Sequence, residues 1–448
     1  MTTKITFMGA GSSVFAKNIL GDCLMAPALH DCEIALYDID PQRLDDSRLM
    51  METLNKNINE GRATIKAYLG VKNRKDALRD AGFVVNAIQI GGYKPSTDID
   101  FEIPKKYGLR QTIADTLGIG GIFRALRTLP VMFEFTREME EVCPHAIFLN
   151  YTNPMCILTA AMLRYTAIQT VGLCHSVQSC VPVLLSNLGL EEKYPAKETR
   201  WTIAGINHMA WLLDLSHNGK DIYPEVRAAG LEKNAAARKS DGEKHGDMVR
   251  LEIMRHFGFY VTESSEHNAE YMPYWIKSQF PELIEEFNIP LDEYPRRCVN
   301  QIEKWTKQRE EIVNNAELSH ERSHEYGSRI IEGVVTNVPF AFHGNVLNTG
   351  LIENLPNDCS VEVPCMANRS GVQACHVGRL PEQLAALDRT NINVQLLTIE
   401  ADQTRKKDTV YQAAMLDPHT AAELTLDQIR SLCDDLFEAH GSIMPQYA

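Results

Sequence analysis

The stretch KITFMGAGSSVF, from Lys4 to Phe15, decides the fold of this chain. A short apolar run that ends at Gly9 is typical of a buried parallel strand. The turn that follows leads into a helix pattern, whose first N–H groups can bind a pyrophosphate. The third fingerprint position is Val14, not glycine or alanine, so the motif is incomplete. A strand–turn–helix whose glycines only relieve crowding also explains this stretch.

Asp38 is the acidic residue that a dinucleotide-binding motif has at the end of its second strand. It ends a predicted strand, EIALYDID, where a carboxylate can accept hydrogen bonds from a ribose 2′-hydroxyl. That arrangement favours NAD over NADP. Gly9 suits the tight turn, Gly11 lets the backbone approach the pyrophosphate, and the serines add hydroxyl donors. We therefore predict a cofactor site made of Gly9, Gly11, Ser12, Ser13 and Asp38.

Strand and helix patterns alternate through the first third of the chain, which predicts a doubly wound parallel sheet. Further strands are expected from Thr64 and over residues 83–92, 146–154 and 170–173. We predict a Rossmann-like NAD-binding lobe over residues 1–195 and a mixed α+β substrate lobe over 196–448, with helices at 301–315 and 426–439. The whole would be an α/β fold like that of lactate and malate dehydrogenases.

Composition limits the class of protein. The 448 residues are 44% hydrophobic and 23% charged, which is ordinary for a globular chain. A formal net charge of −14 argues against a nucleic-acid partner. No apolar run reaches the roughly 18 residues of a membrane span. MTTK leads directly into a strand without a signal peptide, so we expect a cytoplasmic protein whose eleven cysteines are reduced.

Cys174 in VGLCHS and His208 in AGINHMAW are candidate metal ligands. Each alone is more often structural, as a packed thiol or a satisfied core histidine. Their separation matches no zinc-finger spacing. Two protein ligands would leave coordination positions for the oxygens of a substrate. The softness of a thiolate and an imidazole would by itself favour Zn²⁺.

Two further segments carry polar groups that a site could use. Asn153 lies in LNYTNP at the end of a predicted strand, where its amide can bind a sugar hydroxyl, although Asn before Pro also makes turns. TESSEHNAEYMPYW crowds Glu266, His267, Glu270 and Tyr271 together. Burying so many titratable groups is costly without a function, but a solvated helix edge could also carry them.

With these motifs assembled, the chain resembles glycoside hydrolase family 4, and within it the α-galactosidase branch. The resemblance rests on KITFMGAGSSVF, IALYDIDP, QTIADTLG, LNYTNPM, GLCHSVQ, AGINHMAW, TESSEHNAEY and DPHTAA, and covers nearly the whole chain. It implies a glycosidase that needs NAD⁺ and a divalent metal, usually Mn²⁺, and departs from hydrolysis by two carboxylates. Such an enzyme oxidises the sugar at C3, removes the C2 proton, eliminates the leaving group, adds water and returns the hydride.

The resemblance also implies roles for individual residues. Cys174 and His208 match the metal ligands, and Tyr271 matches the base at C2. Asp115 matches an acidic residue that assists this tyrosine. Asn153 and, with a less secure alignment, Arg322 match substrate-binding residues.

Two departures from the family pattern concern the substrate. His175 stands where the phosphoglycosidases have an Asp that protonates the leaving group, and a histidine can act as an acid near neutral pH. Only Lys94 is available where those enzymes have an Arg for a 6-phosphate, which argues for an unphosphorylated sugar. Family members form dimers or tetramers, so we expect a homo-oligomer.

Three other functions compete with an α-galactosidase. An α-glucosidase or an α-glycosiduronase of the same family would share all these motifs. A 2-hydroxyacid dehydrogenase would share the N-terminal fold, but it has no use for a cysteine metal ligand. A non-catalytic NAD-dependent sugar sensor would not need the cysteine, histidine and tyrosine together.

Overall fold

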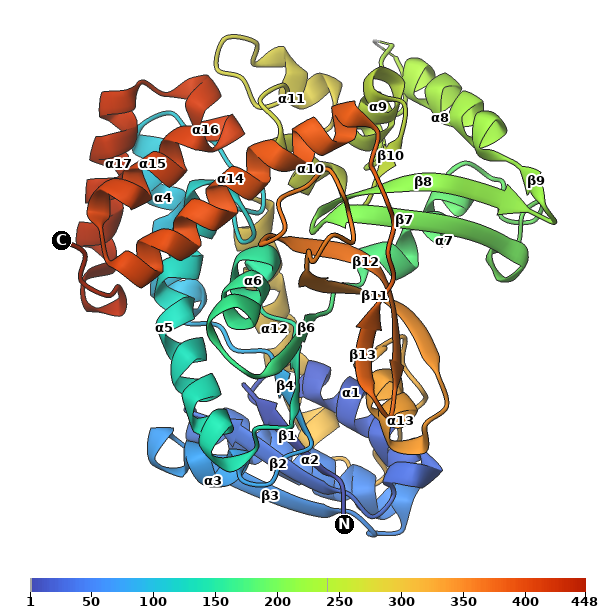
Figure 1. The fold of residues 1–448 in the computed structure, drawn as a ribbon, viewed down its shortest axis with the longest axis vertical. Coiled ribbons are helices and arrows are strands. Elements are labelled where there is room, and N and C mark those ends of the chain that lie inside the picture. Colours follow the sequence, from blue (N-terminus) through green and yellow to red (C-terminus); the bar gives the residue numbers. More distant parts are fainter. Residues whose placement is uncertain (1, 240) are drawn as a thin grey trace.

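The computed structural model describes residues 2–239 and 241–448. Its strands form one mixed sheet in the order β10-β8-β7-β12-β11-β6-β5-β4-β1-β2-β3, with β13 beside β12 and β9 beside β8. Figure 1 shows β1–β3 at one end of the molecule and β7–β9 in the opposite half, below α8 and α9. The strands are β1 (Lys4–Met8), β2 (Glu33–Asp38), β3 (Thr64–Leu69), β4 (Phe83–Asn86), β5 (Ile147–Asn150), β6 (Gln169–Gly172), β7 (Thr199–Ile206), β8 (Met209–His217), β9 (Lys220–Asp221), β10 (Tyr260–Val261), β11 (Phe340–Leu347), β12 (Ser360–Asn368) and β13 (Gly371–Ala374).

The first six strands are all parallel and lie in the order β3-β2-β1-β4-β5-β6. This is the strand order of dinucleotide-binding folds, so the predicted Rossmann-like sheet is confirmed. Side chains of one strand alternate between two cores, because Ile5 and Phe7 pack in one cluster and Met8 in the other. The predicted strand 83–92 ends early, at Asn86.

The antiparallel half of the sheet meets the parallel half at one narrow joint, β6–β11, and a second narrow joint, β7–β12, lies within the antiparallel half. β11 pairs with β6 only through Asn345 and Gly172, and β12 pairs with β7 only through Glu362 and Gly205. Since the sheet continues across residue 195, the C-terminal half extends the N-terminal sheet. The chain leaves β6 towards Cys174 and leaves β7 towards His208, so both candidate ligands follow a joint.

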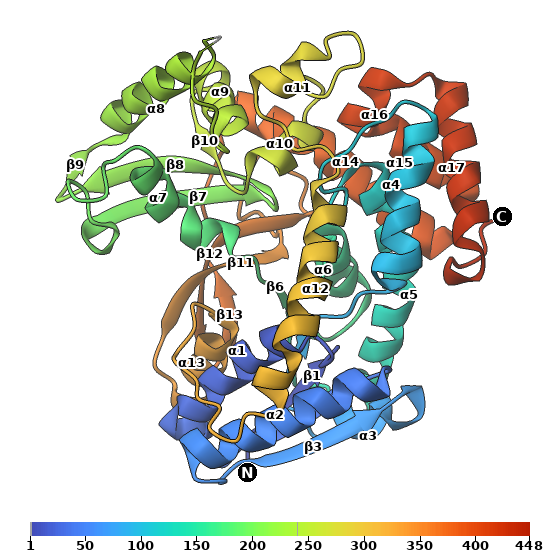
Figure 2. The ribbon, with the colours of Figure 1, turned by 180° about the vertical axis from the view of Figure 1, so that it is seen from behind.

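Helices cover the sheet and form a layer at the C-terminus, where α14–α17 pack together (Figure 1). The predicted helix at 301–315 starts earlier, at Glu293, and an ion pair of 2.6 Å between Arg309 and Asp46 ties it to α2 (Figure 2). The helices are α1 (Ser13–Met25), α2 (Pro41–Asn59), α3 (Arg74–Leu78), α4 (Asp98–Lys106), α5 (Gly118–Val142), α6 (Met155–Tyr165), α7 (Ser176–Asn187), α8 (Tyr223–Ala237), α9 (Met248–Phe257), α10 (Ser265–Tyr271), α11 (Glu282–Glu286), α12 (Glu293–Val313), α13 (Gly327–Thr336), α14 (Glu382–Thr404), α15 (Lys407–Leu416), α16 (Pro418–Glu423) and α17 (Leu426–His440). Among the described residues we find no helix with the length and apolar character that a membrane span requires.

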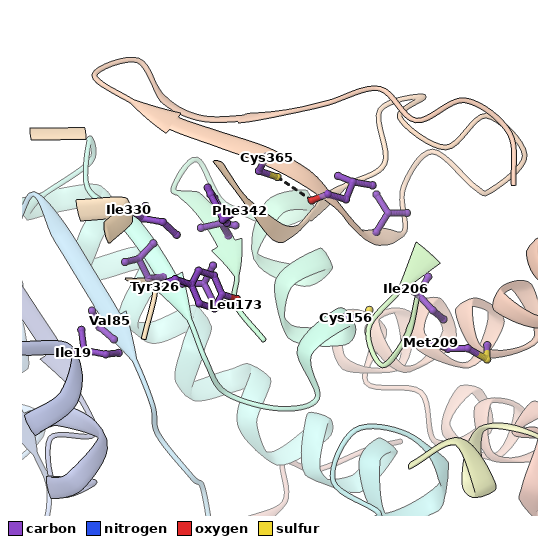
Figure 3. Packing of buried hydrophobic residues seen from close by; sticks show 14 of the residues in the cluster. Ile19, Val85, Cys156, Leu173, Ile206, Met209, Tyr326, Ile330, Phe342 and Cys365 are labelled. Atoms are coloured by element: carbon purple, nitrogen blue, oxygen red, sulfur yellow. Dashed lines mark hydrogen bonds between the residues drawn. The ribbon is translucent and has the colours of Figure 1, made fainter. Parts of the chain in front are cut away.

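The residues that flank the two candidate ligands belong to the hydrophobic core. Leu173, Ile206 and Met209 are almost completely buried in one cluster, shown in Figure 3. Burying side chains of this size stabilises the fold by about 1.5–3 kcal/mol each. Tyr326, in the same cluster, donates its hydroxyl to the Cys174 carbonyl at 2.9 Å. The backbone beneath the site is therefore held rigidly by packing.

Candidate functional site

Three strand ends bring Cys174, His208 and Glu263 together, with their ligand atoms within 4.8 Å of one another. Glu263 Oε2 lies 3.7 Å from His208 Nε2 and 3.8 Å from Cys174 Sγ. Cys174 follows β6, His208 follows β7, and Glu263 follows β10. The predicted Cys–His pair is thus a close pair in space. Sequence reasoning missed Glu263, whose one local signal was its place directly after a short strand.

The electrostatics of this cluster suit a divalent cation. Burial raises the pKa of the Cys174 thiol well above its usual value, and the Glu263 charge raises it further. Burial also acts to raise the pKa of Glu263, but His267, His208 and Arg250 outweigh it and hold that pKa below its usual range. Glu263 is therefore ionised, and a bound cation would favour the thiolate of Cys174 as well. A thiolate, an imidazole and a carboxylate fit such an ion.

Tyr271 lies against the backbone of the histidine ligand. Its hydroxyl accepts a hydrogen bond from the His208 N–H at 3.3 Å, and the residue is 2% exposed. Burial raises the pKa of Tyr271 well above its usual value, and the charges of Asp115 and Glu263 add to this. A phenolate at this position therefore requires a positive charge nearby.

Asp115 and Asn153 form a second polar pair facing the cluster. Asn153 Nδ2 donates to Asp115 Oδ2 at 3.0 Å, and Thr116 Oγ1 donates to Asp115 Oδ1 at 2.8 Å. Burial acts to raise the pKa of Asp115, but Arg124, His267 and His208 outweigh it and hold the pKa below its usual value. Asp115 thus brings a negative charge close to the histidine ligand.

His175 faces a carboxylate that the sequence did not suggest. Its Nε2 lies 2.7 Å from Glu325 Oε2, and the His175 side chain is half exposed. The hydrogen bond to Glu325 raises the pKa of His175 above its usual value, against the opposing effect of burial. A protonated imidazole held at the surface of the site can donate a proton to a leaving group.

Arg322 is not brought into this arrangement. It forms an ion pair with Glu332 at 2.5 Å, and within the described residues it has no hydrogen bond to Cys174 or His208. The residue from this segment that does reach the site is Glu325. Contact of Arg322 with a substrate stays a prediction.

The glycine turn has the geometry expected of a cofactor site. Gly9 has φ +85°, and a Cβ there would come within 2.8 Å of the Ala87 carbonyl oxygen. Asp38 Oδ2 accepts the Gly11 N–H at 2.6 Å, so the carboxylate lies beside the turn. Ser12 is exposed. The Ser13 hydroxyl is instead buried against Ser47 Oγ at 2.9 Å, so this side chain is already paired within the protein.

Comparisons with known proteins agree with this geometry. The model of the family 4 glycosyl hydrolases matches residues 4–190, and that of their C-terminal domain matches residues 203–420. An alpha-galactosidase of Bacillus subtilis (strain 168) is 63% identical over 444 residues, or 99% of each chain. An alpha-galactosidase of Rhizobium meliloti (strain 1021) is 31% identical, covering 99% of this chain and 90% of its own. The structure of a 6-phospho-alpha-glucosidase from gut microorganisms in complex with NAD and Mn²⁺ has the same fold, with a TM-score of 0.80 at 18% identity over 100% of both chains. As its motifs predicted, the chain belongs to glycosyl hydrolase family 4.

Proposed function

We propose that this chain is an NAD- and Mn²⁺-dependent α-galactosidase that hydrolyses terminal α-galactosides. The observation that carries the proposal is 63% identity, over 99% of both chains, to a relative named as an alpha-galactosidase. The cluster of Cys174, His208 and Glu263 supports the metal requirement, and the turn beside Asp38 supports the cofactor. α-Glucosides and α-galacturonides or glucuronides are the alternative substrates.

The chain's own residues divide the work of the reaction. Gly9, Gly11 and the start of α1 bind the cofactor, and Cys174, His208 and Glu263 bind the metal. When bound, NAD⁺ accepts and returns a hydride at the sugar C3, and Mn²⁺ polarises hydroxyl oxygens of the sugar.

The protein supplies the proton transfers on both sides of the sugar. Tyr271 removes the C2 proton, assisted by Asp115. His175, whose pKa is raised by its hydrogen bond to Glu325, donates a proton to the departing oxygen. Asn153 holds a sugar hydroxyl. We also infer a division near residue 195 between cofactor and substrate lobes, a homo-oligomeric assembly and a cytoplasmic location.

The test is an assay across aryl α-galactoside, α-glucoside and α-galacturonide with NAD⁺, Mn²⁺ and a thiol reductant. We expect the α-galactoside to be hydrolysed fastest, with no net formation of NADH. Net reduction of NAD⁺ by a 2-hydroxy acid would instead identify a dehydrogenase. Binding of sugars without turnover of any of them would identify a sensor.

Replacing Asp38 by Ala should weaken NAD⁺ far more than NADP⁺. A hydrogen bond to a charged group contributes about 1.5–3 kcal/mol, so NAD⁺ affinity should fall about 10- to 100-fold. The measurement is a calorimetric titration of the purified protein with each cofactor. Asp40→Ala is the matched control, because Asp40 accepts the Gln42 and Arg43 N–H groups at the start of α2. Equal losses for both cofactors in Asp38→Ala would show that Asp38 does not select between them.

Replacing Glu263 by Gln should weaken Mn²⁺ binding by about tenfold or more, because it removes the ionised group of the cluster at nearly constant volume. Free Mn²⁺ is measured by electron paramagnetic resonance during titration of the NAD-loaded protein. Glu266→Gln is the control, since Glu266 pairs with Arg297 outside the cluster. Unchanged Mn²⁺ affinity in Glu263→Gln would remove Glu263 from the metal site.

A further inference from the structure

Glu270 binds three consecutive backbone amides from a distant part of the chain. It precedes Tyr271 at the end of α10 and is 5% exposed. Its Oε1 accepts the Thr112 N–H at 2.6 Å, and its Oε2 accepts the N–H groups of Ile113 and Ala114 at 3.2 and 3.1 Å. Burial raises the pKa of Glu270, and the three amides oppose this shift because they bind the ionised carboxylate more strongly than the neutral one. Glu270 therefore fastens the segment 112–114 to α10.

The fastened segment is held in a conformation that it would not adopt alone. Ala114 has φ +48°, a left-handed conformation that costs a residue with a Cβ about 1–3 kcal/mol. On its other side the loop presses against the first turn of α5. A Cβ at Gly120 would lie 2.5 Å from the Ala114 carbonyl oxygen, and one at Gly121 would lie 2.7 Å from the Thr116 carbonyl carbon. The two glycines thus let the loop approach α5 closely, while Glu270 holds it from α10.

The segment 112–114 positions Asp115 in the site. Asp115 follows Ala114 directly, and its carboxylate receives the Asn153 side chain at 3.0 Å. The amides that Glu270 binds tie the loop of Asp115 to the residue next to Tyr271. Because Asp115 is attached to the last amide that Glu270 binds, a shift of those amides moves Asp115. Misplacing a reacting group by about 1 Å can lower a rate about 100-fold.

We propose that Glu270 is a positioning residue, which acts through Asp115 to set the carboxylate relative to Tyr271 for removal of the C2 proton. This inference rests on the proposed function. Two consecutive residues of α10 then serve one step, since Tyr271 contacts the proton and Glu270 fixes its acidic neighbour. The competing explanation is that Glu270 only stabilises the fold, as a buried carboxylate bound by amides can.

The test compares Glu270→Gln, Asp115→Asn and the double variant in the holoenzyme with NAD⁺ and Mn²⁺. Glutamine keeps one carbonyl oxygen but turns an NH₂ group towards N–H donors. We expect kcat for an aryl α-galactoside to fall about 10- to 100-fold in Glu270→Gln with little change in KM. The isotope effect from deuterium at C2 should be at least as large as in the wild type. If Glu270 acts through Asp115, the double variant should be no slower than Asp115→Asn alone.

The matched control is Glu252→Gln. Glu252 lies on α9, and its buried carboxylate forms an ion pair with Arg238, with Oε1 2.8 Å from Nη1. Glu252→Gln should lower the thermal unfolding midpoint and leave kcat and the isotope effect unchanged. Glu270→Asp keeps the carboxylate that Glu270→Gln removes, so it should retain part of the kcat lost in Glu270→Gln. It provides a second variant to measure if Glu270→Gln folds poorly. Rate losses that add in the double variant would overturn the positioning role.

Amide hydrogen exchange in the resting protein gives a readout that does not depend on turnover. The peptide containing residues 112–114 should lose protection in Glu270→Gln and keep it in Glu252→Gln. Unchanged protection in Glu270→Gln would also overturn the inference. A wild-type protein that turns over no α-galactoside overturns the proposed function, and the inference falls with it. An active wild type with additive rate losses overturns the positioning role alone.

Discussion

Replacing Tyr271 by Phe is expected to lower α-galactoside hydrolysis by about 10²- to 10⁴-fold, the usual contribution of a general base. The change removes one oxygen from a side chain that is 2% exposed and packed in the core cluster. The only hydrogen bond that its hydroxyl makes within the described residues is the one from the His208 N–H. Binding of NAD⁺ and Mn²⁺ should therefore persist, because no ligand group of either is touched.

Tyr271 can act as a base at neutral pH only if its surroundings lower its pKa. The unperturbed pKa of tyrosine is about 10, and burial together with Asp115 and Glu263 raises it further. A bound divalent cation would act against this shift. Activity should then depend on the metal through the protonation of Tyr271 as well as through the sugar.

The measurement is isotopic. Wild-type enzyme that turns over in D₂O should place deuterium at C2 of the released sugar, whereas Tyr271→Phe should release almost no product. Tyr223→Phe is the matched control. Tyr223 lies on α8, its hydroxyl donates to the Leu212 carbonyl of β8 at 2.7 Å, and its replacement should not affect deuterium incorporation. A wild-type product without deuterium at C2 would exclude elimination, and the assignment of Tyr271 with it.

The sequence could predict those parts of the site that follow directly from a strand. Asp38 and Cys174 each lie at or just after a predicted strand, because apolar runs and terminal turns are local signals. His208 is predicted from its motif, and the strand before it, β7, is not. Because the first six strands are parallel, their carboxyl ends lie along one edge of the sheet, where ligands bind in such folds. Such residues can be found without knowing how the second half of the chain folds.

Glu263 and Glu325 could not be found in this way, because their positions depend on pairings between distant segments. Glu263 reaches the cluster since Val261 of β10 pairs antiparallel with Trp211 of β8. Glu325 reaches His175 from a segment held by α1, where Asp22 Oδ1 accepts the Ser323 N–H at 2.8 Å. Glu325 leaves no pattern in the sequence nearby, and the only local signal of Glu263 is a two-residue strand. The same holds for Arg322, whose local motif gave no indication of its pairing with Glu332.

Replacing Cys174 by Ser is expected to lower Mn²⁺ affinity by about 100-fold or more and to lower activity in parallel. A serine hydroxyl stays protonated near neutral pH, so the site loses an anionic ligand while its volume hardly changes. Burial already raises the pKa of the Cys174 thiol, so the native site gains its thiolate only together with the cation.

This substitution separates metal binding from folding, because Cys174 lies at the surface of the core while its neighbour Leu173 carries the packing. The thermal unfolding midpoint of the metal-free protein should therefore change little. Activity measured against Mn²⁺ concentration should shift to higher concentrations, and excess Mn²⁺ should restore part of it. Cys375→Ser, which changes an exposed cysteine, should keep the wild-type curve. If Cys174→Ser keeps that curve too, the thiol is not a ligand, and His208 and Glu263 would have to hold the ion without it.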